Sequence, residues 1–217
     1  MLLFLDTADL DMIRKAKGSG VLDGVTTNPT HVSREIRTVK DFHVLIREIC
    51  EVVDGPVSAQ VISTSTEGMI EEARELSAVH RHVMVKIPTT PEGIRASSLL
   101  SREGIRTHLT LLFSPAQALL AAKAGAAFAS PFVGRLDELG QHGMELVRQI
   151  RTMYQTYDFS TKLMVAGLRH PIQVVEAALA GAEAATMSPE VFQMLFHHPM
   201  TDIGLERFLK DWSAIQS

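Results

Sequence analysis

Cysteine, which secreted proteins use for disulfides, is nearly absent from this chain, and tryptophan and tyrosine are also scarce. Of its 217 residues one is cysteine, one is tryptophan and two are tyrosine. Because Cys50 has no second cysteine to pair with, no intrachain disulfide is expected, and a reducing cytoplasm is the predicted compartment. The amino-terminal apolar run ends at Asp6, too early for a signal peptide. No apolar run is long enough to span a bilayer, so no membrane association is predicted.

An excess of basic residues is also missing. The chain has 21 Lys and Arg against 25 Asp and Glu, a formal net charge of −4. A general nucleic-acid binder needs a basic surface that displaces counterions from phosphates, so no nucleic-acid partner is predicted. The nine histidines show no HExxH or comparable ligand spacing, so they are expected to be solvent-exposed or to have local packing roles. Apolar residues make up 46% of the chain, which is typical of a soluble globular enzyme.

Short apolar runs alternate with longer amphipathic stretches along the whole chain, a pattern typical of βα units that build a parallel sheet. Strands are predicted at residues 2–6, 24–27, 57–61, 83–87, 107–112, 127–132, 162–166 and 184–187. Helices are predicted at residues 10–17, 39–53, 66–80, 91–102, 115–124, 139–154, 171–180 and 203–212.

Eight such units predict an α/β protein of one domain over residues 1–217: a (β/α)8 TIM barrel with an extra C-terminal helix. An open doubly wound sheet that binds nucleotides would have a glycine-rich turn after its first strand, where this chain has Asp6-Thr7-Ala8-Asp9. The final helix carries apolar residues that need a partner surface, either the base of the barrel or a neighbouring subunit. These are Leu205, Phe208, Leu209 and Trp212.

Side chains at the carboxyl ends of barrel strands face the active-site mouth. The polar or aromatic residues that the predicted strands place there, or just beyond, are Asp6, Thr26, Asn28, Gln60, Lys86, His108, Thr110, Ser130, Phe132, Arg135 and Arg169.

Lys86 stands out within this set. Strand alternation puts it on the same face as Met84, and the apolar neighbours of Lys86 point the other way, toward the helices. A desolvated amine has a lowered pKa and can condense with a ketone to an iminium, which permits carbon–carbon cleavage beside it. Asp6 could then carry the proton. The alternative is a solvated or ion-paired lysine, which is the commoner state of a lysine at a strand end.

The chain resembles the transaldolase and fructose-6-phosphate aldolase family, in its short, single-barrel branch. The resemblance covers nearly the whole sequence and is carried by FLDTA (4–8), GVTTNP (24–29), VKIP (85–88), SPFVGR (130–135), RHP (169–171) and DIGLERF (202–208). Together, in this order and at this spacing, the segments are highly specific. Only TTNP and VKIP are moderately diagnostic alone.

The resemblance implies that a dihydroxyacetone unit is held on Lys86 as an enamine and passed to an aldehyde. The residues it implies as catalytic are Lys86 (Schiff base), Asp6 (proton transfer), Thr110 (holding a water) and Gln60. Those implied as substrate-binding are Asn28, for the donor hydroxyls, Arg135 and Arg169, for a phosphate, and Thr26, His108, Ser130, Phe132 and Gly167. It also implies a homo-oligomer, a pentamer or a decamer, and it implies no metal or organic cofactor.

Four positions depart from a single family pattern. Gln60 matches the aldolases, whereas transaldolases have glutamate there; Phe132 matches the transaldolases, whereas the aldolases have tyrosine. His108 replaces the asparagine usual in transaldolases and is either a proton carrier near neutral pH or a hydrogen-bonded structural imidazole. Gly167 replaces a serine that helps bind phosphate. These changes suggest a different terminal anion, for example a sulfonate in place of the phosphate.

Three functions remain open from the sequence. The first is a transaldolase that passes dihydroxyacetone from a sugar phosphate, or from a sugar sulfonate such as 6-deoxy-6-sulfofructose, to an aldehyde acceptor. The second is an aldolase that releases free dihydroxyacetone. The third is a barrel that binds a sugar phosphate without catalysis, which predicts no borohydride-trapped adduct on Lys86.

Overall fold

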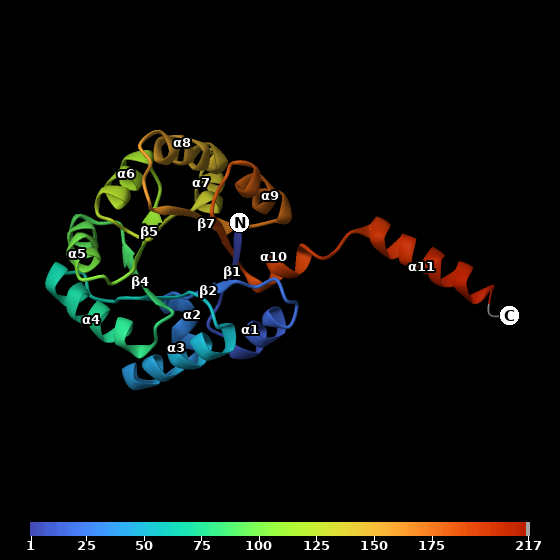
Figure 1. Cartoon of the computed structure of the whole chain (residues 1–217), viewed down its shortest axis with the longest axis horizontal. Coiled ribbons are helices and arrows are strands. Elements are labelled where there is room, and N and C mark those ends of the chain that lie inside the picture. The colour runs from blue at the N-terminus through green and yellow to red at the C-terminus, as the bar shows by residue number, and fades with distance from the viewer. Residues whose placement is uncertain (216–217) are drawn as a thin grey trace.

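Eight parallel strands form a closed barrel, in which each strand pairs with the next and β8 pairs with β1. The computed structural model describes residues 1–215. The predicted (β/α)8 barrel with an additional C-terminal helix is confirmed, and Figure 1 shows the helices as an outer ring around the strands. The strands are β1 (Leu2–Asp6), β2 (Gly24–Thr26), β3 (Val57–Gln60), β4 (Val83–Pro88), β5 (Thr107–Leu112), β6 (Phe128–Pro131), β7 (Lys162–Leu168) and β8 (Ala184–Met187).

Most helices begin at a side-chain cap, often with proline directly after it. Ser114, for example, accepts a hydrogen bond from the Gln117 N–H, and Pro115 occupies the first helical turn. The helices are α1 (Leu10–Lys17), α2 (Pro29–Glu35), α3 (Val39–Val53), α4 (Thr66–Val79), α5 (Pro91–Arg102), α6 (Pro115–Lys123), α7 (Val133–Glu138), α8 (Gly143–Thr156), α9 (Pro171–Leu179), α10 (Pro189–Met194) and α11 (Pro199–Ser213).

The predicted helix at 139–154 is wrong at its start, because residues 139–142 lie in a turn between α7 and α8. Gly140 there has a φ of 74°, a left-handed conformation that glycine adopts without strain and that ends α7. Three short helices were not predicted: α2, α7 and α10. Each has six or seven residues, too few for a 3.6-residue period to be recognised.

The hydrophobic core has two parts. The larger fills the space between the strands and the surrounding helices and includes Cys50, whose buried thiol has a pKa raised to about 12, as expected of a structural cysteine. The smaller part lies inside the barrel and consists of Phe4, Met84, Phe128, Met164 and Ala184. Met84 therefore faces the interior, and the neighbouring β4 residues Val83, Val85 and Ile87 face the helices, which confirms the predicted alternation.

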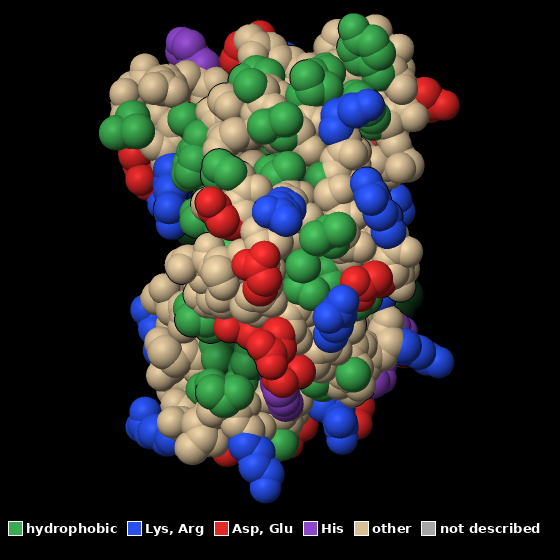
Figure 2. All heavy atoms as spheres, turned by 90° about the vertical axis from the view of Figure 1, so that its left-hand side faces the viewer, with side chains coloured by type: hydrophobic (Ala, Val, Ile, Leu, Met, Phe, Trp, Pro, Cys, Tyr) green, Lys and Arg blue, Asp and Glu red, His purple; other side chains and the backbone are tan. Residues whose placement is uncertain are grey.

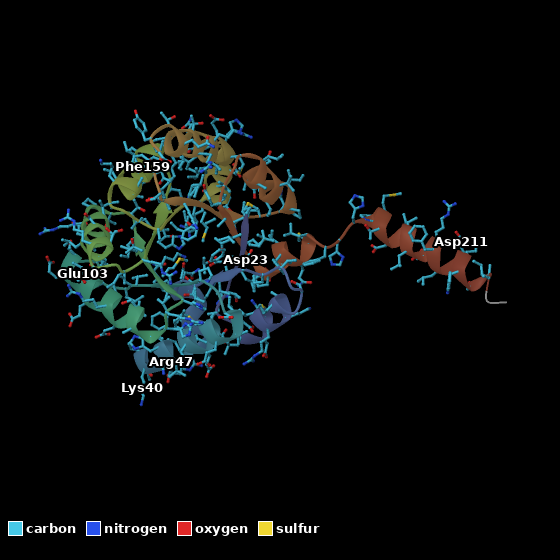
Figure 3. All side chains as sticks on the ribbon, viewed as in Figure 1. Asp23, Lys40, Arg47, Glu103, Phe159 and Asp211 are labelled. Atoms are coloured by element: carbon cyan, nitrogen blue, oxygen red, sulfur yellow. The ribbon has the colours of Figure 1, made fainter. Side chains whose placement is uncertain are left out.

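The C-terminal helix α11 stands apart from the barrel (Figure 1). None of its residues is buried, so packing on the base of its own barrel is excluded as an explanation of its apolar side chains. Asp211, labelled in Figure 3, lies far from the ring of helices. Within residues 1–215, no helix is both long enough and apolar enough to cross a membrane.

The face shown in Figure 2, on the side of α4 and α5, carries acidic and basic side chains interspersed with hydrophobic ones. Arg74 on α4 and Glu103 after α5 form a two-point ion pair there, at 3.0 and 2.7 Å.

Candidate active site

The strand registers arrange the inward-facing side chains in layers drawn from alternate strands, as is usual in this fold. Four layers follow from the amino ends of the strands to the mouth. The lowest layer consists of Gly24, Met84, Phe128 and Ala184, and the layer above it consists of Phe4, Ser58, His108 and Met164. The third layer consists of Thr26, Lys86, Ser130 and Thr186. The uppermost layer consists of Asp6, Gln60, Thr110 and Ala166. The interior thus changes from apolar to polar toward the mouth.

Lys86 lies in the third layer and is only 5% exposed. Its Nζ donates a hydrogen bond to the main-chain oxygen of Thr27 at 3.0 Å. Burial lowers the pKa of the amine from its ordinary value, because the ammonium form is poorly solvated there, and the negative charge of Asp6 acts in the opposite direction. The amine is thus almost fully buried and within the electrostatic influence of a carboxylate.

Asp6, at the end of β1, is held in place by its neighbours. Thr26 Oγ1 donates to Asp6 Oδ1 at 2.8 Å and is itself bonded to Thr186 Oγ1 at 2.6 Å. The carboxylate remains 31% exposed, so it faces the mouth as well as the amine. A carboxylate that is fixed by a hydroxyl yet open to the mouth is able to exchange protons with a bound molecule.

His31, in the first turn of α2, approaches Asp6, contacts Asn28 and is a site residue that the sequence interpretation missed. Asn28 caps α2: its Oδ1 accepts from the His31 N–H at 3.0 Å, and its Nδ2 lies 3.3 Å from His31 Nδ1. The same ring nitrogen is 3.8 Å from Asp6 Oδ1. The Asn28-Pro29 pair, a cap followed by proline, was the available signal for this helix.

Thr110 is 1% exposed, and its Oγ1 has no hydrogen-bond partner among the described residues. A buried hydroxyl without a partner is unusual and points to a group that binds there. The next residue, Leu111, has a φ of 56°, a left-handed conformation that costs a leucine roughly 1–2 kcal/mol, and the β5–β6 register shifts at this point. Such local strain often accompanies functional sites.

Gln60 lies next to Lys86 in register, in the uppermost layer. Together with Asn28 it also lines a pocket of about 360 Å³ beside the mouth, between α2, the start of α3 and the end of β3. The rest of this pocket is largely apolar, with Val32, Ile36, Phe42 and Ile62 among its lining residues. Gln60 thus lies beside Lys86 on the neighbouring strand and also lines the pocket.

His108 and Ser130 belong to a buried hydrogen-bond chain. Ser58 Oγ lies 2.7 Å from His108 Nδ1, and Ser130 Oγ lies 2.6 Å from His108 Nε2, so both ring nitrogens are occupied. Burial, and secondarily the charge of Lys86, hold the pKa of His108 well below its ordinary value. The imidazole is therefore neutral at physiological pH.

The two arginines lie at the rim, where α7 meets the end of β7. Arg135 stacks over the Phe132 ring, with its guanidinium carbon 5.1 Å from the ring centre. Arg169 Nη2 is 2.6 Å from Glu138 Oε1, a pair that the sequence interpretation did not anticipate. Gly167 has a φ of 70°, a backbone conformation that only glycine adopts at little cost. A residue with a side chain would therefore strain the backbone at this position.

No group of three or more His, Cys, Asp or Glu side chains within residues 1–215 is arranged to hold a metal ion. The groups assembled at the mouth are a buried amine, a carboxylate, several hydroxyls, two amides and two arginines. Their chemistry suits carbonyl condensation and proton transfer on a molecule with an anionic end.

Comparison with known proteins shows the family of the chain. The family model described as transaldolase/fructose-6-phosphate aldolase matches residues 3–217. A protein of Petrotoga mobilis described as a probable transaldolase is 55% identical over 216 residues, covering 100% of this chain and 96% of the relative. Probable transaldolases of Caldicellulosiruptor saccharolyticus (53% identical, 99% and 98% covered) and Aquifex aeolicus (54%, 99% and 98%) are similarly close.

A solved structure, the thiamine phosphate pyrophosphorylase from Pyrococcus furiosus, superimposes with a TM-score of 0.63. The alignment covers 89% of this chain and 93% of that one, at 12% sequence identity. At this identity the likeness concerns the barrel alone.

Proposed function

Because the chain belongs to the transaldolase/fructose-6-phosphate aldolase family, we propose that it is a Schiff-base transaldolase, which transfers a dihydroxyacetone unit from a ketose phosphate to an aldehyde. The observation that carries this proposal is the burial of Lys86 beside Asp6, with a hydrogen bond to a neutral carbonyl. Burial disfavours the ammonium form, so a larger fraction of the amine is neutral and nucleophilic at physiological pH.

In the first half-reaction, Lys86 Nζ attacks the ketose carbonyl carbon, and loss of water leaves an iminium. Asp6 takes the proton from the hydroxyl that becomes the carbonyl of the departing aldehyde. The carbon–carbon bond breaks, and its electron pair moves to the iminium to form an enamine. The fixed position of Asp6 supports this role, because Thr26 holds one carboxylate oxygen at 2.8 Å.

In the second half-reaction, the enamine carbon attacks the acceptor aldehyde, and Asp6 returns its proton to the new alkoxide. Water then hydrolyses the iminium and frees the amine. Thr110 and Gln60 hold this water in the proposal, since Thr110 Oγ1 is buried without a partner in the described chain and Gln60 adjoins Lys86. Asn28, Thr26 and Ser130 bind the donor hydroxyls.

Phe132 favours transfer over hydrolysis. A phenyl ring cannot polarise water, so free dihydroxyacetone should be released slowly compared with transfer to an acceptor aldehyde. The experiment mixes fructose 6-phosphate with the enzyme, with and without erythrose 4-phosphate, and measures glyceraldehyde 3-phosphate. A large acceptor dependence supports a transaldolase. Equal rates favour the alternative, an aldolase that releases dihydroxyacetone.

Arg135 and Arg169 bind the terminal anion of the substrate in this proposal. One specific observation favours a sulfonated ketose, such as 6-deoxy-6-sulfofructose, as a second candidate: Glu138 neutralises Arg169, which lowers the positive charge available to a phosphate dianion. Gly167 also lacks the hydroxyl that the family's serine offers. Turnover of fructose 6-phosphate against its 6-sulfo analogue tests this, and a strong preference for the phosphate rejects the sulfonate.

The covalent step has a direct test. Borohydride added with a ketose substrate reduces the iminium, and peptide mapping should find the adduct on Lys86. A barrel that only binds sugar phosphates leaves no adduct, and this result would remove the catalytic proposal.

The proposal includes a homo-oligomer, a pentamer or a decamer, in which each chain is one domain over residues 1–217 and α11 packs on a neighbouring subunit. The support is the exposure of apolar side chains on α11: Ile203, Leu205, Phe208, Leu209 and Trp212. A stripe of this kind is seldom left in water.

A further inference from the structure

A buried imidazole lies beside Lys86 in strand register, one layer below it in the barrel interior. His108 is 1% exposed and belongs to the layer below Lys86, with its ring 6.2 Å from that of Phe128 in the apolar cluster. The proposed reaction has no step for this ring. A histidine is also an unusual choice for a barrel interior, because burying an imidazole without partners is costly.

The ring is fully satisfied by two serines. A neutral imidazole has one N–H and one bare nitrogen, so one serine accepts a hydrogen bond from the ring and the other donates to it. The distances of 2.7 Å to Ser58 and 2.6 Å to Ser130 leave no space for water between these groups. The three side chains join β3, β5 and β6 across the interior and close the barrel below the lysine.

We propose that His108, bridged by Ser58 and Ser130, is a positioning residue for Lys86: it fills the barrel beneath the amine and keeps water away from it. This inference rests on the proposed function of Lys86 as the nucleophile. A smaller residue at 108 would leave a void lined by two hydroxyls. Such a polar void admits water, which would solvate the ammonium form.

The charges around the amine fit this role. Asp6 faces Lys86 from β1, and His31 on α2 approaches Asp6. On β5, His108 remains neutral, because burial and the charge of Lys86 hold its pKa well below the ordinary value. The imidazole therefore provides bulk and hydrogen bonds without placing a second positive charge next to the amine.

Competitive acetylation with acetic anhydride tests the inference without any substrate. Only the neutral amine reacts, so the rate at Lys86 as a function of pH, read by peptide mapping, reports its pKa. We expect His108→Ala to shift this profile to higher pH by about one unit, which is about tenfold slower acetylation at neutral pH. His108→Gln should restore the profile, because its amide both donates and accepts and can bridge the two serines.

Ser97→Ala is the matched control. Ser97 Oγ is hydrogen-bonded to Thr107 Oγ1 at 2.6 Å, and this pair is as buried as the His108 chain. Thr107 directly precedes His108 but points to the face of β5 that meets the helices. Ser97→Ala should leave the acetylation profile of Lys86 unchanged. If His108→Ala does not fold, Ser58→Ala, which removes one hydroxyl of the chain, should give a smaller shift in the same direction.

The outcomes separate this inference from the proposed function. An unshifted profile in a folded His108→Ala or Ser58→Ala variant overturns the role of His108, even if borohydride still traps a ketose on Lys86. Absence of trapping in the unaltered protein rejects the Schiff base, whatever the acetylation profiles show. If His108→Ala loses activity while the acetylation profile of Lys86 stays unshifted, His108 has a structural role only.

Discussion

Lys86 Nζ donates to the main-chain oxygen of Thr27 at 3.0 Å. A carbonyl accepts a hydrogen bond from an amine as well as from an ammonium group, so this contact positions the nitrogen without requiring its charge. A carboxylate at the same place would hold the proton on the lysine. The carboxylate of Asp6 acts on Lys86 through its charge, and burial opposes it.

Replacing Lys86 with methionine should abolish trapping and turnover while the barrel stays folded. The amine has a pKa of 10.5 in the unfolded chain and a lower one when folded. Between these two values the unfolded chain binds more protons, so the stability of the unaltered protein rises with pH. Below the folded pKa the cost of burying the ammonium is fully present. Denaturation across this window should therefore show that Lys86→Met has a higher free energy of unfolding than the unaltered protein. This difference should shrink as the pH rises toward 10.5.

Asp6→Asn should separate binding of the ketose from its cleavage. Loss of the negative charge leaves burial unopposed, so the pKa of Lys86 falls further and trapping extends to lower pH. Loss of the proton acceptor should lower kcat by about 10²- to 10⁴-fold. Asp11→Asn, an exposed aspartate paired only with Arg14 in the described structure, is the control and should change neither quantity. Parallel loss of trapping and turnover would argue against a proton-transfer role for Asp6.

The barrel was predictable because each strand and each long helix has its own hydrophobic pattern within a short stretch of sequence. β1, β5 and β8 begin and end at the predicted residues. α2 was not predicted, because only Val32 of its seven residues is buried and no apolar period exists to be read. α7 begins without a side-chain cap, so it lacks the usual starting signal as well.

The candidate site was predictable residue by residue but not as a set of contacts. Strand ends identified Lys86, Asp6 and Thr110 as neighbours of the mouth, because all carboxyl ends of a closed parallel sheet meet there. The pairings of His31 with Asp6 and of Glu138 with Arg169 depend on helices that were not predicted. Sequence alone also left His108 between two roles, since its two serine partners come from other strands.

Trp212 offers a specific test of the oligomer proposal. It is the only tryptophan of the chain and lies exposed on α11. If α11 packs on a neighbouring subunit, its emission should be blue-shifted at high protein concentration and shift to the red on dilution or after Phe208→Asp, with a fall in mass by analytical ultracentrifugation. Lys210→Glu, a polar position on α11, should leave both readings unchanged. A monomer at all concentrations would contradict the proposal.

Glu138→Gln should reveal which terminal anion the site prefers. The substitution removes the negative charge 2.6 Å from Arg169 and so adds one unit of net positive charge at the rim. A phosphate dianion gains more from this than a sulfonate monoanion. Because the pair is more than half exposed, the effect should be modest: KM for fructose 6-phosphate should fall about twofold to fivefold, and KM for its 6-sulfo analogue should fall less.

Glu145→Gln is the matched control for this test, because Glu145 pairs with Arg148 on α8 at similar exposure. It should change neither KM, which excludes a general effect of net charge. If the natural substrate is a sulfonate, the unaltered enzyme should have a higher kcat/KM for the 6-sulfo ketose than for fructose 6-phosphate. Glu138→Gln should make the two kcat/KM values more similar. If Glu138→Gln leaves KM for both substrates unchanged, Arg169 does not bind the anion, and the substrate's charged end must lie elsewhere on the rim.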